Sequence, residues 1–376
     1  MKTKLPEGWE EVELGKIFEF QKKSKIKAGD GSKEGKYKFF TSSDKQTKFI
    51  DEYNQDGEYL IFATGGHAGI HYCNEKFATS TDCFIVKVDG AVLAKYVYYY
   101  LFSKIRLLEE GFKGAGLKHI SKGYIQTMRI SYPKNIETQK KIVSILEKAE
   151  NAKELRKEAD ELSKDYLKSV FVDMFGDPIK NNKKYPSDKL VNICNLKSGG
   201  TPSRKEPKFF QGKIPWITTV SLGQKYISDK DAVEHITEEA IKKSATKIIP
   251  KNSIMVGVRV GVGKASINEC EMCTNQDIAS LVDIDKSMNV EFLLEVFRYY
   301  EKHFESQMRG ATIKGITSGT LKELEIIKPP IELQNKFASI VKQVEQMKEH
   351  QKESKQELDN LFNALMQKAF KGELKC

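Results

Sequence analysis

Residue types suited to catalysis occur in this sequence, but they do not form a complete catalytic or metal-binding pattern. The stretch Gly257–Lys264 resembles a phosphate-binding loop, yet the spacing from its first glycine to Gly-Lys is one residue too long. Ala265 also stands where a Ser or Thr would hold magnesium. Cys270 and Cys273 have CxxC spacing, but no second CxxC completes a zinc site. We therefore expect a chain that is not an enzyme and that holds no cofactor and no metal.

Side chains suited to binding a polyanion are easier to identify. The loop Ser198–Lys205 (SGGTPSRK) carries hydroxyls and two cations. Such a loop can hydrogen-bond phosphates and place Arg204 at a base edge, although an ordinary surface turn is the plain alternative. The DNA-binding candidates of this half of the chain are Thr201, Ser203, Arg204, Lys205, Thr218, Thr219, Ser221, Arg259, Lys264, Arg309 and Lys314.

The first half of the chain offers counterparts at equivalent positions. Gln21–Lys27 carries four lysines in seven residues, and hydroxyls follow a predicted strand as they do in the second half. A solvated surface charge is the plain alternative for any one of these residues, and their equivalent clustering favours binding. The candidates here are Lys22, Lys23, Lys25, Lys27, Ser42, Ser43, Lys45, His67, His71, Lys113 and Lys118.

The positive charge of the chain is divided between two regions. Residues 1–135 carry 22 Lys+Arg against 17 Asp+Glu, and residues 177–330 carry 24 against 19, so each region has a net charge of +5. Residues 136–176 (8 against 9) and 331–376 (8 against 7) are almost neutral. Two equally basic regions separated by near-neutral segments indicate two contacts with a polyanion.

The chain has the length and composition of a globular protein with more than one domain. Its 376 residues are enough for two or more hydrophobic cores. No apolar run approaches the 18 residues or more of a membrane span, and the first residues lack the apolar core of a signal peptide. We expect a cytoplasmic protein without membrane contact, with its six cysteines reduced.

The regions that position these candidates are repeated in tandem. Phe112–Ile120 aligns with Met308–Ile316 at an offset of 196, and shorter strand-and-turn stretches align at offsets of 176 to 195. Short strands with few helices predict a mixed α/β (α+β) lobe in each repeat, with a helix at 93–110 in the first lobe. The predicted division is a first lobe at 1–135, a helix at 136–176, a second lobe at 177–330 and a helix at 331–373.

Each lobe is followed by a long predicted helix. Ile136–Phe175 and Ile331–Phe370 align without a gap at an offset of 195 and contain neither Gly nor Pro. Their composition favours helices of about 60 Å at 1.5 Å per residue. The heptad positions form coiled-coil seams with polar centres. The predicted seams are Ile145, Ala149, Ala152, Arg156, Ala159, Ser163, Tyr166 and Val170, with Leu155 and Leu162 alongside, and Ile340, Val344, Met347, Gln351, Ser354, Leu358, Leu361 and Leu365.

This order of elements predicts a geometry. The first helix leads from one lobe to the other, so a second helix of equal length can pair with it only by running back. We expect two lobes joined by two long antiparallel helices with pseudo-twofold symmetry. The seam from Ile145 to Val170 is about 38 Å long, close to the spacing of about 34–36 Å between DNA half-sites one helical turn apart.

The motifs of this sequence, in their order, resemble the DNA-specificity subunit of type I restriction-modification enzymes. The resemblance covers essentially all of residues 5–374. The motifs that carry it are Leu5–Trp9 (LPEGW), Ser198–Ser203 (SGGTPS), Gly212–Ile217 (GKIPWI), Thr274–Asp277 (TNQD), Gly310–Lys314 (GATIK) and the helix start Ile331–Gln334 (IELQ).

The resemblance implies a function and a set of partners. The two lobes would be target recognition domains, each reading one half of a bipartite site in double-stranded DNA. The helices would set the half-site separation and dock two methyltransferase subunits, with the nuclease/translocase subunit joining that core. Methyl transfer and ATP-driven cleavage would belong to these partners. The first lobe has Gln21–Lys27 in place of SGGTP and Thr79–Asp82 in place of TNQD, so the lobes are expected to read different half-sites.

Two other classes of function fit parts of the sequence. A coiled-coil adaptor that binds proteins but not DNA would show DNA retention that is absent or insensitive to salt, whereas phosphate contacts make binding depend on salt. An RNA-binding protein is the second alternative, but the sequence lacks the stacked-aromatic signature of single-strand binders. Tyr98, Tyr99 and Tyr100 form a small cluster that we interpret as the packing face of a helix.

Overall fold

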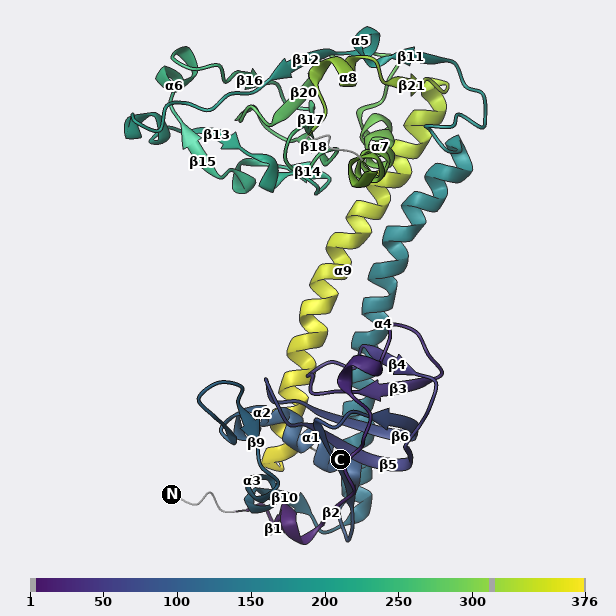
Figure 1. Cartoon of the computed structure of the whole chain (residues 1–376), viewed down its shortest axis with the longest axis vertical. Helices are drawn as coiled ribbons and strands as arrows, with labels where there is room; N and C mark the ends of the chain where they lie inside the picture. The colour runs from purple at the N-terminus through teal and green to yellow at the C-terminus, as the bar shows by residue number, and fades with distance from the viewer. Residues whose placement is uncertain (1–4, 311–314, 375–376) are drawn as a thin grey trace. The chain divides into compact units, whose positions relative to one another are not determined.

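Two long helices dominate the secondary structure of the computed structural model, which describes residues 5–310 and 315–374 (Figure 1). They are α4 (Ile136–Phe175) and α9 (Ile331–Lys371), so both predicted long helices are confirmed. Each ends where the next glycine takes a left-handed conformation, at Gly176 (φ 72°) and at Gly372 (φ 76°). Glycine adopts this conformation without steric cost and therefore stops a helix.

The chain divides into two compact units, each of which contains parts of both long helices. Unit 1 comprises Met1–Ala159 with Gln351–Cys376, and unit 2 comprises Asp160–His350. Each unit combines one predicted lobe with the adjoining halves of α4 and α9. The predicted mixed α/β class is confirmed in both units.

Unit 1 is built around a six-stranded sheet with the strand order β2-β7-β5-β6-β3-β4. Its neighbours pair antiparallel except β3 and β6, which are parallel. Helix α1 packs on β5 and β6. The elements are β1 (Trp9–Glu13), β2 (Phe18–Phe20), β3 (Tyr37–Phe40), β4 (Lys48–Ile50), β5 (Gln55–Ala63), β6 (Ile70–Thr79), β7 (Cys83–Val88), α1 (Ala94–Ser103), α2 (Ile105–Glu109), β8 (Phe112–Lys113), β9 (His119–Ile120), α3 (Lys122–Thr127) and β10 (Arg129–Pro133), with 3-10 turns at Leu14–Lys16 and Ala28–Asp30.

Unit 2 is built around two larger sheets, with the strand orders β12-β20-β17-β18-β14 and β15-β13-β19-β16. The elements are β11 (Ser187–Lys189), α5 (Leu190–Ile193), β12 (Asn195–Ser198), β13 (Ile214–Ile217), β14 (Tyr226–Ile227), β15 (Glu234–Ile236), α6 (Glu238–Lys242), β16 (Ile248–Ile249), β17 (Ile254–Gly257), β18 (Ala265–Asn268), β19 (Met272–Thr274), β20 (Ile278–Val282), α7 (Val290–Gly310), α8 (Ser318–Lys322) and β21 (Glu325–Ile327), with 3-10 turns at Pro207–Phe210, Thr219–Ser221 and Asp229–Asp231.

Unit 1 has one large sheet where unit 2 has two, and this difference has a local cause. The single strand β6 of unit 1 aligns at an offset of 195 with a stretch that unit 2 divides into β18 and β19. At the break, the buried Asn268 amide donates to the carbonyls of Pro250 (2.7 Å) and Cys270 (2.8 Å). The side chain replaces strand pairing there, because buried backbone carbonyls require a partner. One continuous sheet thereby becomes two.

The predicted tandem repeat is visible in long-range backbone hydrogen bonds that occur at equivalent positions of both units. Each bond in unit 1 has a counterpart in unit 2 between aligned residues. The pairs are Thr64 N to Asp82 O (3.1 Å) with Val258 N to Asp277 O (2.8 Å), Ile120 N to Thr64 O (3.1 Å) with Ile316 N to Val258 O (2.7 Å), and Ser80 N to Phe40 O (2.8 Å) with Asn275 N to Ile217 O (3.1 Å).

Within each unit the segments of α4 and α9 run antiparallel. In unit 1, Lys153 of α4 contacts Asp359 of α9 at 2.8 Å and lies over the Phe362 ring. In unit 2, Phe171 lies farther along α4 and packs against Phe337, nearer the start of α9, with ring centroids 5.4 Å apart. Later residues of one helix therefore meet earlier residues of the other.

The predicted seams are correct in part: Val344 is buried, and Ile145, Val170, Ile340 and Leu365 are half-buried. Ser163 and Gln351 are buried and Arg156 is half-buried, as the polar centres predict. Tyr166, Met347 and Leu361 are exposed instead of buried, as are Leu155 and Leu162 beside the seam. Where the helices pack on the lobes, residues outside the predicted seams are buried in the cores. They are Leu167, Phe171, Phe175, Phe337, Val341, Phe362, Met366 and Ala369. The lobes supply large apolar partners at these ends, and this shifts the buried face away from strict heptad positions.

One further expectation needs correction. The helix predicted over 93–110 is split into α1 and α2, because Lys104 between them has a non-helical conformation (φ −121°, ψ 36°). Strands β1 and β11 pair antiparallel with β10 and β21. Tyr99 and Tyr100 are buried in the packing face of α1, as predicted. Across residues 5–310 and 315–374, no helix is long and apolar enough to cross a membrane.

Candidate functional site

Three loops of unit 1 that carry predicted DNA-binding residues are joined by hydrogen bonds. The Ser42 hydroxyl donates to the Gly65 carbonyl (2.8 Å) and accepts from the Gly65 N–H (2.7 Å). The Gly66 N–H donates to the Lys118 carbonyl (3.2 Å). We call the residues joined here, Ser42, Gly65, Gly66, Lys118 and His119, the unit 1 cluster. It collects residues from the loops after β3, β5 and β8 at one place.

Histidines support this cluster in different ways. His71 Nε2 lies 2.8 Å from the Ser43 carbonyl, and burial lowers the pKa of His71, so we expect a neutral ring that holds the Ser43 loop. His119 Nδ1 lies 3.1 Å from the Thr64 carbonyl, and His119 was not among the predicted residues. His67 is exposed in the turn between β5 and β6.

The lysines of the loop after β2 are exposed, and this loop is anchored near the start of β7. Lys22, Lys23, Lys25 and Lys27 all face solvent. The Thr81 N–H donates to the Ile26 carbonyl (2.9 Å), and the Lys23 ammonium lies 4.9 Å from the Phe84 ring centroid. These contacts tie the loop to the start of β7. Lys45 and Lys113 are exposed as well, on the loop after β3 and on β8.

In unit 2, the loop Ser198–Lys205 is held against a strand end by its glycines. The Gly200 N–H donates to the Thr274 carbonyl (2.8 Å) and the Trp216 indole donates to the Gly200 carbonyl (3.1 Å). A Cβ atom on Gly199 would lie only 2.1 Å from the Asn275 carbonyl oxygen. Only glycine permits so close an approach, which explains the Gly-Gly pair in this loop.

A polar pocket of about 570 Å³ lies beside this loop. Its lining includes Ser198, Arg259, Gln276 and Ser318. Thr201 bonds to the Gln276 amide oxygen (2.5 Å), and the Arg259 guanidinium lies 3.7 Å from the Asp277 carboxylate. The structure thus brings two predicted residues, Thr201 and Arg259, to one place. Gln276 belongs to the TNQD motif but was not predicted as a binding residue.

Arg204 lies on a separate part of unit 2 and already has a partner. Its guanidinium makes two contacts with the Glu234 carboxylate, at 2.7 and 2.6 Å, and stacks over the Phe210 ring at 4.2 Å. A fork of this kind fixes the guanidinium in one orientation. Sequence alone gave no signal for Glu234, which is 30 residues away on β15.

The other predicted residues of unit 2 are dispersed. Thr219 is buried, Thr218 is half-buried, and the Ser221 hydroxyl donates to the Asp231 carbonyl (2.8 Å). Ser203, Lys205 and Lys264 are exposed. Lys314 and the side chain of Arg309 lie outside the described residues.

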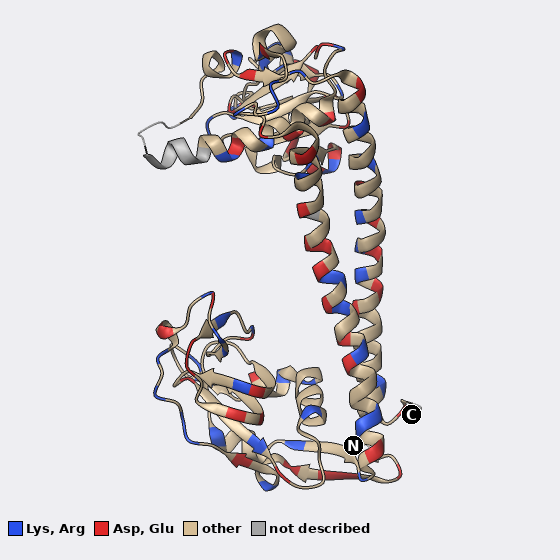
Figure 2. Ribbon diagram, turned by 90° about the vertical axis from the view of Figure 1, so that its right-hand side faces the viewer, with Lys and Arg blue, Asp and Glu red and all other residues tan. Residues whose placement is uncertain are grey.

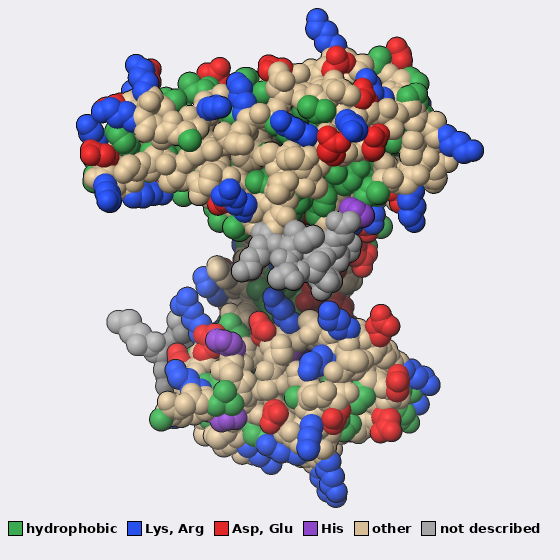
Figure 3. All heavy atoms as spheres, turned by 45° about the horizontal axis from the view of Figure 1, so that its top comes forward, with side chains coloured by type: hydrophobic (Ala, Val, Ile, Leu, Met, Phe, Trp, Pro, Cys, Tyr) green, Lys and Arg blue, Asp and Glu red, His purple; other side chains and the backbone are tan. Residues whose placement is uncertain are grey.

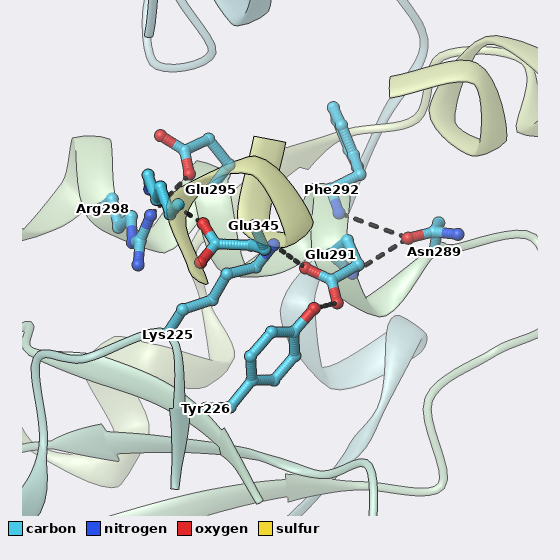
Figure 4. Close-up of polar contacts among 9 residues, drawn as sticks. Lys225, Tyr226, Asn289, Glu291, Phe292, Glu295, Arg298 and Glu345 are labelled. Carbon is cyan, nitrogen blue, oxygen red and sulfur yellow. Dashed lines mark hydrogen bonds and ion pairs between the residues drawn. The ribbon is translucent and has the colours of Figure 1, made fainter. Parts of the chain in front are cut away.

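A half-buried charged cluster connects the sheet of unit 2 to helix α7. Lys225 and Tyr226 both reach Glu291 (Figure 4). The Lys225 ammonium lies 2.8 Å from the Glu291 carboxylate, and the Tyr226 hydroxyl donates to the other carboxylate oxygen. Burial and this hydrogen bond raise the pKa of Tyr226, so it stays a neutral donor. The cluster holds β14 against the helix.

The long helices present a second kind of surface in unit 2. A groove of about 700 Å³ is lined mainly by apolar side chains of α4 and α9, among them Leu162, Tyr166, Ile340 and Met347. Leu162 is 68% exposed and Tyr166 52%. Acidic and basic residues are interspersed along both long helices (Figure 2). An exposed apolar strip on such a helix pair has the character of a protein-binding surface.

On the face that Figure 3 shows, the charged side chains of each unit are dispersed. Lys and Arg side chains are distributed with acidic ones between them over the visible face of each unit (Figure 3). Among the residues that the structure describes, no three His, Cys, Asp or Glu side chains gather as metal ligands. Cys273 is buried in the core, as a plain structural role predicts.

Comparison with known proteins identifies the family. The family model for the type I restriction modification DNA specificity domain matches residues 6–162 and 182–360, the greater part of both repeats. The chain therefore belongs to this family. The match covers the two lobes and most of both long helices.

Individual relatives and solved structures agree with this assignment. The specificity subunit of the type I restriction enzyme MjaIX of Methanocaldococcus jannaschii is 29% identical over 194 residues, which cover 50% of this chain and 45% of that protein. The MjaVIII specificity subunit of the same organism is 21% identical over 409 residues, covering 99% of this chain and 94% of its own. A crystal structure of the type I S subunit from M. genitalium has the same fold, with a TM-score of 0.63, 18% identity and 98% of each chain covered.

Proposed function

We propose that this chain reads a bipartite sequence in double-stranded DNA, with one half-site for each lobe. The observation that carries the proposal is the repeated hydrogen-bond framework, which gives both units the same arrangement of loops around the turn that follows β5 or β17. Side chains that suit DNA stand on these loops in both units. In unit 1 they include Ser42 and Lys118, and in unit 2 they include Thr201 and Arg259.

The individual contacts follow from the chemistry of each side chain. Exposed lysines such as Lys22 and Lys118 are suited to phosphates, which fix orientation without reading sequence. Arg259 and Gln276 end in groups that pair with the edges of guanine and adenine in the major groove. Arg204, already paired with Glu234, is suited to positioning the loop Ser198–Lys205. The other predicted residues that are exposed, such as Lys45, Lys113 and Lys205, are proposed as phosphate or base contacts. Thr219, which is buried, and His71, which holds the Ser43 loop, are suited to supporting roles.

We further propose that the chain recruits catalytic subunits and performs no catalytic step itself. The apolar groove of α4 and α9 in unit 2 is suited to dock a methyltransferase subunit, and a second copy of that subunit would dock on the unit 1 half of the helices. A nuclease/translocase subunit would join this core. Relatives of the chain are specificity subunits of restriction enzymes, which supports this division of labour.

The test is a map of methylated positions in the host genome, with and without the gene for this chain. Methylation at a two-part sequence with a fixed spacer is expected only when the chain is present. A second arm uses the complex assembled from purified subunits on plasmid DNA. Methylation by that complex without preference for flanking sequence would refute the proposal, and salt-independent DNA retention would favour an adaptor without DNA readout.

A further inference from the structure

An apolar side chain stands at the tip of a hairpin in unit 1, between Lys113 and Lys118. Strands β8 and β9 pair antiparallel and are joined by the loop 114–118. Leu117 in this loop is 72% exposed. Lys113 and Lys118 on either side of it are exposed as well.

The hairpin that carries Leu117 is anchored by the residues that follow it. The hairpin is fixed at its base, where the Ile120 N–H donates to the Thr64 carbonyl (3.1 Å) and Ile120 is buried. The Lys118 carbonyl accepts from Gly66 (3.2 Å), and Gly65 forms a β-bridge with His119. The chain therefore holds Leu117 outward on an anchored two-stranded ribbon.

A two-stranded ribbon of this size fits the major groove of DNA. Of the groups that base pairs present in that groove, the 5-methyl of thymine is the apolar one, and it is recognised by apolar side chains. Lys113 and Lys118 flank the tip, where they can contact phosphates on either side. We propose that Leu117 contacts the 5-methyl group of a thymine in the half-site read by unit 1. This inference rests on the proposed function, since it assigns one base contact within it.

Uracil is the probe for this contact, because it differs from thymine only by lacking the methyl group. The experiment uses the complex of the full chain with its methyltransferase subunits and duplexes of the mapped target. Each thymine of both half-sites is replaced in turn by deoxyuridine. One replacement, in a single half-site, should weaken wild-type binding about fourfold, the factor for one buried methyl group.

The variant Leu117→Ala should bind the thymine duplex more weakly and no longer distinguish it from the uracil duplex. Val191→Ala, at an exposed apolar position on α5 of unit 2, is the control and should keep the discrimination. The inference is overturned if wild type binds all uracil duplexes as well as thymine ones, if neither half-site contains thymine, or if Leu117→Ala still discriminates. A complex that methylates without sequence preference would instead refute the proposed function.

Discussion

Replacing Gln334 by leucine should destabilise unit 2 more than any exposed substitution on the same helix. Gln334 is fully buried in the first turn of α9. Its amide oxygen accepts from the Asn289 N–H (2.8 Å), and its NH₂ group donates to the carbonyls of Ser287 (3.1 Å) and Pro329 (2.7 Å). These bonds join the start of the long helix to the loop before α7.

The magnitude follows from the three bonds. Each hydrogen bond contributes about 1 kcal/mol net, and a buried donor left without a partner costs about 1–3 kcal/mol. Leucine has a similar volume but no polar atoms, so the variant should lose about 3 kcal/mol. For a unit of this size the Tm should fall by about 6–12 °C, at about 2–4 °C per kcal/mol.

Calorimetry and urea unfolding of the full chain measure this loss. Gln346→Leu, at an exposed position on the same helix, is the matched control and should change the Tm by no more than about 1–2 °C. Gln139 makes the equivalent bonds in unit 1, to Leu93, Ala91 and Pro133, so Gln139→Leu should have an effect of similar size. A loss below about 1 kcal/mol for Gln334→Leu, or one no larger than that of the control, would refute the reasoning.

Three other predictions follow from the contacts of unit 2 and from the buried thiols. Lys225→Met should lower the free energy of unfolding by about 3 kcal/mol, measured in urea, because it leaves the Glu291 carboxylate without its cation. Adding Glu291→Gln should recover part of this loss. An equal loss in the single and the double variant would contradict the ion pair. Leu162→Asp should lower the methyltransferase subunit that co-purifies from two copies to one without lowering the Tm, whereas Lys157→Asp on the exposed surface of the same helix should retain both copies; two copies retained by both variants would contradict docking in the groove. Stability should fall as pH rises above about 9, because the unfolded chain releases thiol protons that the folded chain keeps; burial raises the pKa of Cys83 and Cys273 to about 11 and of Cys194 to about 12, from 9.0. A Tm that stays constant from pH 8 to 10.5, or a Cys194→Ala variant with an unchanged slope, would argue against this linkage.

The sequence was sufficient to locate the long helices because the signal is local. An unbroken run of helix-forming residues that ends at a glycine defines α4 to within its last residue. The seams were less predictable, because the buried face near each lobe is set by residues distant in sequence. Phe171 and Phe175 both pack against Phe292 of α7, and a heptad pattern contains no information about that helix.

The candidate site was also only partly predictable from the sequence. The glycine turns and hydroxyl-bearing loops were recognisable from their composition, but their partners were not. The sequence suggested that Arg204 is available to bind DNA, but in the structure it is paired with Glu234. His119 and Gln276 join their clusters through contacts 55 and 75 residues away along the chain. Such pairings depend on the sheet order, which short strands of two to ten residues do not specify.

The repeated framework is compatible with the proposal that the two lobes read different half-sites. The bonds that position the loops run from backbone to backbone, so they do not depend on which side chains the loops carry. At aligned positions of the turns, unit 1 has Gly65 and His67 where unit 2 has Arg259 and Gly261. The scaffold is therefore preserved while the groups that would face DNA differ. We expect the two half-sites to have different sequences, and a target with two identical half-sites would mean that these side chains do not read bases.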